Sequence, residues 1–257
     1  MMSGWVRVVC AFVLGVMSMQ VHGGSPLLWQ SNSVSYLYGD GFTVNPARQH
    51  TLTLEHVSGW RYGDLFAFVD VTRFADEEDF YHGRQTWYGE FSPRLSFGKM
   101  LGREFSAGPV SDLLLAATWE TGKGDVESLL LGAGVDLQFP GFDYFQLNVY
   151  RRMPQNNRDG QTWQLTPVWG MRFPLAGSTL VFDGFIDWVP QSEGSYSHNL
   201  HLNPQLKYDL GQRLGWGGQR FYAGLEYSYW QNKYGIRHSP AFKTNQHAYS
   251  LLLKWHF

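Results

Sequence analysis

Apolar side chains recur at every second residue along almost the whole chain beyond residue 28. The C-terminal segment shows the pattern most clearly, because one of its faces carries Tyr249, Leu251, Leu253, Trp255 and Phe257. Successive side chains of a β-strand point to opposite faces, so this period predicts strands with one apolar face. No segment shows a convincing helical period of 3.6 residues.

Twelve segments share this pattern. Their predicted spans are 29–38, 48–57, 63–71, 86–96, 111–120, 128–138, 143–151, 161–173, 179–188, 200–209, 220–230 and 247–257. Pro93, Pro167 and Pro204 fall inside predicted strands. Because proline cannot donate to a strand ladder, we expect weaker pairing at these three positions.

The connections between these segments alternate in length. Short ones such as 58–62 and 174–178 alternate with long or polar ones such as 72–85, whereas 97–110 and 210–219 are longer than this alternation predicts. An even number of strands with short turns at one end and longer loops at the other is typical of an outer-membrane barrel with both termini inside the cell envelope. The sequence therefore predicts an all-β fold, a transmembrane antiparallel β-barrel of about 12 strands with up-and-down topology.

The alternation does not say which face points inward, because a soluble lipocalin-like barrel or a sandwich has the same period. Three features favour an apolar exterior. Twelve strands enclose more space than side chains fill in an eight-stranded barrel. The apolar faces carry Trp, Tyr and Phe towards strand ends, as in an aromatic girdle, and the polar faces carry charges that a wet lumen would hydrate.

The first residues predict a targeting segment. Arg7 precedes an apolar run over 8–19, which is shorter than the roughly 20 residues that a membrane-spanning helix needs. We therefore expect a signal peptide over 1–23 and a barrel over 24–257, with a buried core helix as the alternative for the first segment. The only cysteine, Cys10, lies within the apolar run, so a lipoprotein anchor, a disulfide framework and thiolate metal sites are not expected.

The charge and the polar residues argue against several kinds of function. The net charge of −2 does not indicate the excess of basic residues that is typical of nucleic-acid-binding proteins. The nine histidines lack chelating spacing and are interpreted as solvated loop or rim residues; the acidic run over 76–79 is interpreted as a hydrated loop, with divalent cation binding as its alternative. Ser239 follows His238, but the sequence around it lacks the nucleophile elbow of a hydrolase. Taken together, these observations lead us to expect no enzyme activity, no metal and no cofactor.

The polar faces carry residues that suit a solute pathway. Acids and bases opposed across a narrow pore create a strong transverse field, although the same groups would also stabilise a closed, hydrated plug. Mixed charge interleaved with aromatic rings suits an uncharged solute that has one flat and one hydroxylated part. The candidate lumen residues are Glu90, Arg94, Asp136, Tyr150, Tyr222, Glu226 and Trp230.

Several short stretches carry a further signal: 90–96 (EFSPRLS), 105–109 (FSAGP), 132–136 (GAGVD), 227–235 (YSYWQNKYG) and, less clearly, 184–188 (GFIDW). In their order and spacing they resemble one family of outer-membrane proteins, the Tsx-type nucleoside-specific channels and the related OmpK proteins. The resemblance covers most of 29–257, is looser in the first strand, and goes with shorter loops than the nucleoside channels have. It implies a monomeric twelve-stranded barrel with a narrow nucleoside pore, lumen positions for Glu90, Arg94 and Asp136, and an ordered connection over 97–110.

Together these observations predict a channel for passive uptake of nucleosides or similar small neutral solutes in the outer membrane of a Gram-negative bacterium. Bases would stack on Tyr150, Tyr222 and Trp230, and ribose hydroxyls would meet Glu90, Glu226 and Arg94. The alternative is a closed barrel that acts through its surface loops as a structural protein, an adhesin or a phage receptor. The expected partners are the solute, outer-membrane lipid and lipopolysaccharide, possible phages, and the barrel assembly machinery, because the terminal Phe257 resembles the signature which that machinery reads.

Overall fold

The computed structural model describes residues 26–257 except 76, 77, 80–82, 104, 106, 125 and 156–158. The predicted signal peptide therefore lies outside the described residues, as does part of the acidic run. The strands are β1 (Leu27–Asp40), β2 (Gln49–Trp60), β3 (Gly63–Phe74), β4 (Gln85–Ser96), β5 (Val110–Gly122), β6 (Glu127–Leu137), β7 (Tyr144–Pro154), β8 (Trp163–Leu175), β9 (Ser178–Val189), β10 (Asn199–Asp209), β11 (Phe221–Gln231) and β12 (Gln246–His256). The helical turns are α2 (Phe97–Leu101), α3 (Leu210–Leu214) and η1 (Lys233–Gly235).

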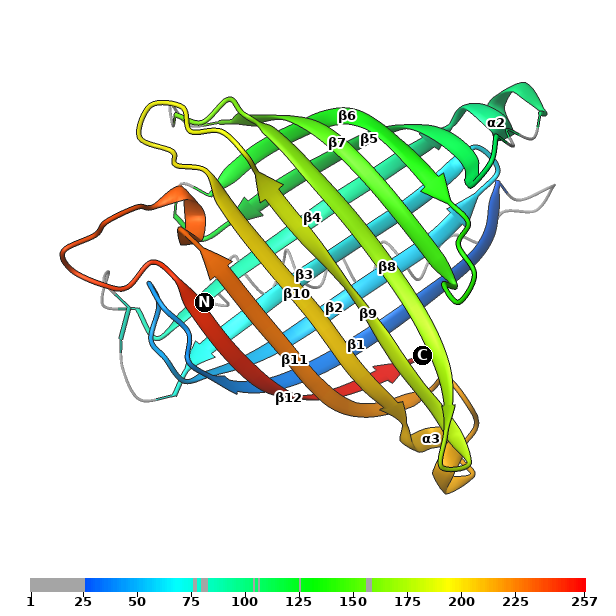
Figure 1. The fold of residues 1–257 in the computed structure, drawn as a ribbon. Coiled ribbons are helices and arrows are strands. Elements are labelled where there is room, and N and C mark those ends of the chain that lie inside the picture. The colour runs from blue at the N-terminus through cyan, green and yellow to red at the C-terminus, as the bar shows by residue number, and fades with distance from the viewer. Residues whose placement is uncertain are drawn as a thin grey trace, which may run out of the picture.

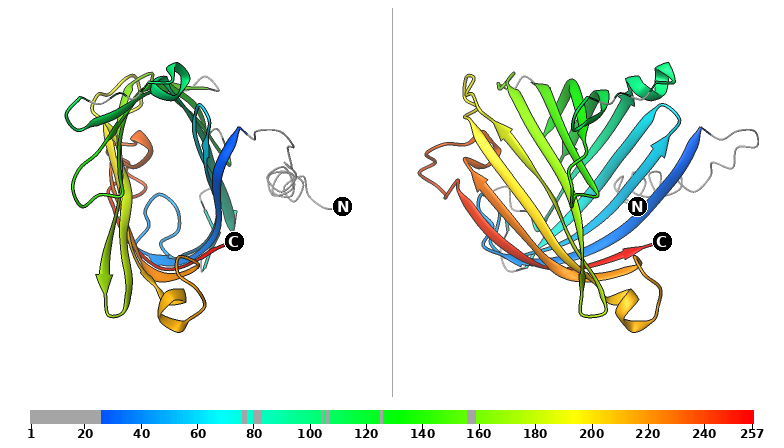
Figure 2. Two further views of the ribbon diagram at one scale, coloured as in Figure 1. Left: turned by 90° about the vertical axis from the view of Figure 1, so that its right-hand side faces the viewer. Right: turned by 45° about the vertical axis from the view of Figure 1, so that its right-hand side comes forward.

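Each strand pairs antiparallel with its neighbours in sequence, and β12 pairs with β1, so the sheet closes on itself. Figure 1 shows the steeply tilted strands, and the end view of Figure 2 shows an oval cross-section. The predicted twelve-stranded antiparallel barrel is confirmed. In the described part of the chain, no helix is long and apolar enough to cross a membrane.

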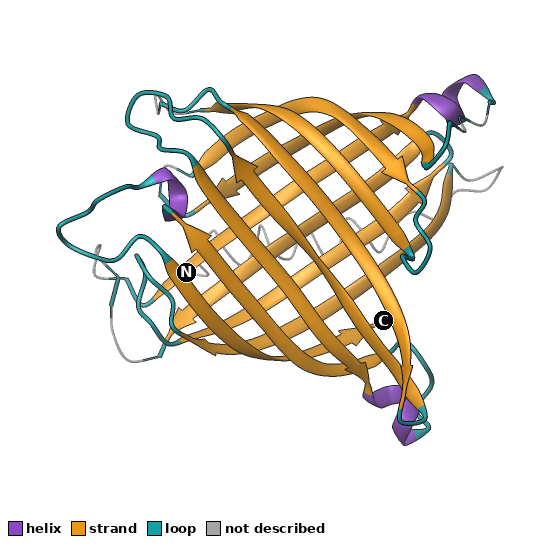
Figure 3. Cartoon of the chain, in the orientation of Figure 1, coloured by secondary structure: helices purple, strands orange, loops and turns teal. Residues whose placement is uncertain are grey.

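The two ends of the barrel differ. One end, here called the terminus end, holds both ends of the barrel sequence, the two-residue connections 61–62 and 176–177, and the helices α2 and α3 (Figure 3). In the hairpin between β8 and β9, Ala176 and Gly177 both have positive φ angles, as a type I′ turn requires. The opposite end, called the loop end, carries connections 41–48, 75–84 and 232–245 among others.

The long connections at the terminus end have a local cause. Ser96 accepts from the backbone N–H of Lys99 at the start of α2, and Asp209 accepts from that of Gln212 at the start of α3. Both side chains sit at the last residue of a strand, so each cap turns the chain directly from strand into helix. The ordered connection expected over 97–110 thus begins with α2, and α3 accounts for 210–219.

The prolines interrupt the ladder on one side only. The β4–β5 pairing stops at Phe91 and resumes at Arg94, while Pro93 still lies opposite Leu65 of β3. The register is the same before and after the gap. Similar gaps lie beside Pro167 and Pro204. The predicted weakening is confirmed, and the barrel tolerates it because the other neighbour keeps each strand in register.

The apolar faces point outward. On β12, Leu251 is 63% exposed and Leu253 is 45% exposed, whereas Leu252 and Lys254 are 1% and 6% exposed and face inward. A soluble barrel would bury the first pair and expose Lys254. Aromatic rings gather on the exterior near both ends: Tyr227 stacks on Tyr249 towards the loop end, and Phe139, Phe142 and Phe145 pack edge to face at the terminus end. The exterior therefore has the apolar band and aromatic girdles of a membrane barrel.

Candidate functional site

A branched ion pair lies on the inner wall near the terminus end. Arg94 of β4 donates from Nε and Nη2 to the two carboxylate oxygens of Asp64 at 2.8 and 2.7 Å, and from Nη1 to Asp136 at 2.8 Å. Its side chain is only 5% exposed. Because all three residues occupy inward positions on nearby strands, the guanidinium fork can bind two carboxylates at once.

Small residues make room for this cluster. The inward neighbour of Arg94 on β5 is Ala116, and on β6 the motif Gly132–Ala133–Gly134 leads to Asp136. A Cβ on Gly132 would lie 1.8 Å from the backbone oxygen of Val149. A Cβ on Gly134 would lie 2.6 Å from Asn148 Oδ1. The two glycines therefore permit close packing of β6 beside the Arg94 cluster.

A second cluster crosses the wall formed by β5 to β9, closer to the loop end. Arg152 of β7 pairs with Glu120 of β5 and donates to Gln164 of β8 at 3.1 Å. Gln164 in turn donates to Asp187 of β9 at 2.9 Å. The ring centroid of Tyr196, from loop 190–198, lies 5.9 Å from the Arg152 guanidinium carbon. This network joins four strands and one loop at the inner surface.

A third group of ion pairs lies on the wall formed by β9 to β12 and β2. Lys207 Nζ donates to Asp183 at 2.7 Å, and Lys254 Nζ donates to Glu55 at 2.6 Å. Gln205 donates to Glu226 at 2.7 Å and accepts from Lys207 at 2.9 Å, which links Glu226 to the same group. These contacts hold the side chains of the wall in fixed positions.

Other inward carboxylates accept hydrogen bonds from neutral donors. The Tyr88 hydroxyl donates to Glu90 at 2.7 Å, and Thr53 donates to Asp70 at 2.6 Å. Both acceptors are half-buried. Hydrogen bonds of this kind orient a carboxyl group within the lumen.

Aromatic rings line the interior towards the loop end. The Trp230 indole is stacked on the His201 imidazole, with centroids 4.0 Å apart and planes 10° apart. Phe185 meets His201 edge-on at 5.1 Å, and Tyr234 meets Trp230 edge-on at 5.4 Å. The interpretation of all histidines as loop or rim residues is therefore wrong for His201, which lies within β10 on the inner face.

The remaining aromatic candidates are more deeply packed. Tyr150 belongs to a buried cluster with Ala116 and Leu130 inside the barrel and is 5% exposed. Tyr222 is 7% exposed and lies against His256 near the terminus end. Trp230 is half-buried, so it offers more ring surface to the lumen than either tyrosine.

The loop end is tied together by a buried lysine. Lys233 Nζ donates to the Thr43 carbonyl at 3.1 Å and to Gln246 Oε1 at 2.5 Å, and it lies 5.7 Å from the Phe42 ring centroid. Burial lowers the pKa of Lys233 to about 7. In the end view of Figure 2, loop 41–48 and η1 lie within the outline of the barrel. Lys233 thus joins two loops over the mouth.

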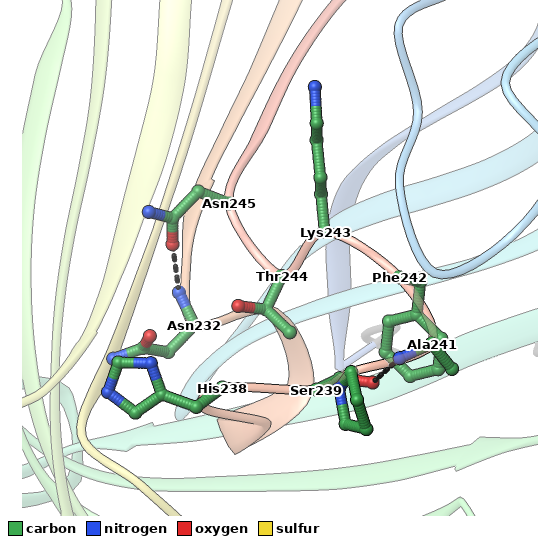
Figure 4. A pocket seen from close by; sticks show the side chains of 9 residues that line it. Asn232, His238, Ser239, Ala241, Phe242, Lys243, Thr244 and Asn245 are labelled. Atoms are coloured by element: carbon green, nitrogen blue, oxygen red, sulfur yellow. Dashed lines mark hydrogen bonds between the residues drawn. The ribbon is translucent and has the colours of Figure 1, made fainter.

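A pocket at the same end is lined by Asn232 and residues 238–245 (Figure 4). Asn245 Oδ1 accepts from the backbone N–H of Asn232 at 2.9 Å, and Ser239 Oγ accepts from that of Ala241 at 3.2 Å. His238 Nε2 instead accepts from Arg237 at 2.9 Å. The two neighbours considered for hydrolysis, Ser239 and His238, therefore have separate partners. Within the described residues, no group of three or more His, Asp and Glu side chains could hold a metal ion.

All seven sequence-predicted site residues occupy inward positions, but they do not form one site. Arg94 contacts Asp136, Glu226 belongs to the third group of ion pairs, and Trp230 lies towards the loop end. Sequence analysis missed Asp64, Glu120 and Arg152. Asp64 shares the inward period of Asp70 on β3, which was the one signal that could have found it.

An apolar belt outside, a charged and aromatic wall inside and complete closure define a class of protein, the outer-membrane channels. The profile of the family described as "Nucleoside-specific channel-forming protein, Tsx" matches residues 27–257. The chain therefore belongs to the Tsx family of channel-forming proteins.

Two curated relatives agree with this assignment, and one solved structure has a similar fold. An outer membrane protein OmpK of Vibrio parahaemolyticus is 29% identical over 190 residues, covering 72% of this chain and 70% of the relative. A second OmpK, from V. parahaemolyticus serotype O3:K6 (strain RIMD 2210633), is 26% identical over 216 residues and covers 79% of each chain. The KdgM porin has a similar fold, with a TM-score of 0.50 and 10% identity over 88% of this chain and 99% of the porin.

The protein is thus an outer-membrane channel of a Gram-negative bacterium, from a family that is described as channel-forming. In this setting the terminus end faces the periplasm and the loop end faces the outside, because outer-membrane barrels have short periplasmic turns and longer external loops.

Proposed function

We propose that the channel passively admits nucleosides or similar small neutral solutes. The observation that carries this proposal is a half-buried aromatic ring at Trp230 together with fixed inward carboxylates, Glu226 on the same strand and Glu90 on β4. A nucleoside has a flat base and a hydroxylated sugar, and these two parts match the two kinds of group. The description of the family as nucleoside-specific supports this choice of solute.

In this proposal the base stacks first on Trp230 and then passes Tyr150 and Tyr222, while sugar hydroxyls exchange hydrogen bonds with Glu90, with Glu226 and with the Arg94 cluster. At that cluster the solute meets the carboxylates of Asp64 and Asp136, which Arg94 holds in place. Each contact is weak, so the solute moves from one to the next without being trapped. No cofactor or energy source takes part.

Liposome swelling tests this proposal. Vesicles containing the full chain should swell in adenosine much faster than in sucrose, and the Trp230→Ala variant should reduce the rate with adenosine but not with the small sugar ribose. Equal rates with adenosine and sucrose would refute specificity for nucleosides.

The remaining expectations concern partners and processing. We infer that 1–23 is removed as a signal peptide, that the barrel works as a monomer in contact with lipopolysaccharide, and that Phe257 is read by the barrel assembly machinery.

The loops that Lys233 and Thr43 join over the mouth also present a defined surface. That surface favours phage attachment or adhesion as a second function, which deletion of 238–245 would abolish without affecting swelling.

A further inference from the structure

The inner wall carries an excess of carboxylates that lack a basic partner. Apart from the fully buried Asp209, five inward carboxylates of the described strands form no ion pair with a described residue and accept from neutral or backbone donors: Asp70, Glu90, Asp112, Asp187 and Glu226. All five are half-buried and so retain contact with lumen water. They come from five different strands, so negative charge surrounds the passage rather than lying on one side of it.

The ion pairs do not offset this excess at the surface of the lumen. The side chains of Arg94, Lys207 and Lys254 are 5%, 6% and 7% exposed. Their carboxylate partners are more than three times as exposed, with 26% for Asp64, 28% for Asp136, 21% for Asp183 and 23% for Glu55. The basic groups lie against the wall, and oxygen atoms face the water.

A solute inside the barrel therefore meets oxygen atoms both from the carboxylates that have no basic partner and from the carboxylates of the ion pairs. The pair between Arg152 and Glu120 is the exception, since both side chains are largely buried, and the other inward base, Arg172, is paired at the terminus end with Asp143. Low-dielectric walls concentrate the field of such groups and raise the local concentration of counter-ions. Rings of Asp and Glu have this effect in cation channels, whereas anion pores are lined with Arg and Lys.

We propose that the lumen is selective for small cations over small anions. The carboxylate oxygens that face the lumen water attract a permeating cation and repel an anion, because the basic partners lie behind them against the wall. This preference among small ions does not rest on the proposed passage of nucleosides.

The reversal potential of the purified full chain in a planar bilayer, measured in a KCl gradient at mildly alkaline pH, tests this inference. We expect K⁺ to be roughly tenfold more permeant than Cl⁻. The variant D70N/E90Q/D187N/E226Q keeps the shape and accepting oxygens of these side chains and should bring the ratio close to one. The single variant Glu226→Gln should give an intermediate ratio, and it preserves a test in case the fourfold variant does not assemble.

Glu193→Gln is the matched control, because it removes a carboxylate from the exposed loop 190–198 and should leave the ratio unchanged. A wild-type ratio of one or below, no conductance, or an unchanged ratio in both amide variants would overturn the inference. Preference for K⁺ together with identical swelling in adenosine and sucrose would refute the nucleoside proposal alone.

Discussion

The imidazole of His201 and the indole of Trp230 lie face to face inside the barrel, with centroids 4.0 Å apart. They come from paired positions on β10 and β11, so the strand register itself sets their stacking. A flat ring held in this way is pre-oriented for stacking by a flat solute, because its side-chain entropy is already restricted.

Replacing Trp230 with alanine should weaken nucleoside binding in the lumen. Stacking of a base on an aromatic side chain contributes about 1–3 kcal/mol, so the adenosine concentration that half-blocks the current should rise by about fivefold to about 150-fold. Trp163→Ala is the control, since Trp163 is 49% exposed on the outer face. Block that is unchanged in Trp230→Ala would remove this ring from the pathway.

Replacing Arg94 with methionine should destabilise the barrel. It leaves Asp64 and Asp136 without their shared partner, and we expect the free energy of unfolding to fall by about 2 kcal/mol. The loss is smaller than for a fully buried pair because both carboxylates contact water. Arg172→Met is the control: its pair with Asp143 is exposed, so the change should be about 0–1 kcal/mol. Urea titration in lipid vesicles measures both, and equal effects would contradict this account of the cluster.

Leu251→Arg tests the orientation of the wall. Leu251 lies at the centre of β12 on the lipid-facing side, where a basic residue costs about 2–4 kcal/mol. Leu175→Arg, on the outer face at the terminus end, should cost about 0–1 kcal/mol because it lies near the interface. Unfolding from vesicles gives the two values. A tolerated arginine at 251 would mean that this face does not meet acyl chains.

Lys233 should make the mouth sensitive to pH. Its pKa is lowered by burial to about 7, while a free lysine titrates near 10.4. Between about pH 7 and about 10, Lys233 is protonated when the loop is open and neutral when the loop is closed. The closed loop therefore becomes more stable relative to the open one as the pH rises through this range. Below about pH 7 the buried lysine is charged as well, so the closed loop bears the full cost of burying that charge. Hydrogen exchange of residues 42–47, corrected for intrinsic rates, should therefore be faster under mildly acidic conditions than under alkaline ones.

The variant Lys233→Met keeps the side-chain length without the charge and should flatten that pH dependence. Lys243→Met, in the exposed part of the same loop, should leave it as in the wild type. If the dependence persists in Lys233→Met, another group controls the loop.

The strands were predictable because their signal is local. Alternation over 111–120 and 48–57 located β5 (Val110–Gly122) and β2 (Gln49–Trp60), and the errors are confined to strand ends. The inward position of Glu226 follows from the same period. The five residues of α3 are too few to show a helical period, so the sequence pattern did not predict this helix or its N-cap at Asp209.

The ion pairs were not predictable, because their partners are distant in sequence. Arg152 falls just beyond the predicted strand 143–151, yet it lies in β7 and pairs with Glu120, which is 32 residues away. Arg94 was assigned to the lumen from the polar face of its strand and from the family resemblance, but its partner Asp64 lies 30 residues before it. Which acid meets which base depends on strand tilt and register, and neither is encoded in a single segment.

The central claim is that the barrel encloses an open passage that recognises nucleosides. Single-channel recording of the purified chain in a planar bilayer, with adenosine added in steps, tests it most directly. The account predicts a small, steady conductance that adenosine lowers in a saturable manner and that sucrose leaves unchanged. A barrel that inserts but conducts no current, or a conductance that adenosine does not reduce, would contradict it.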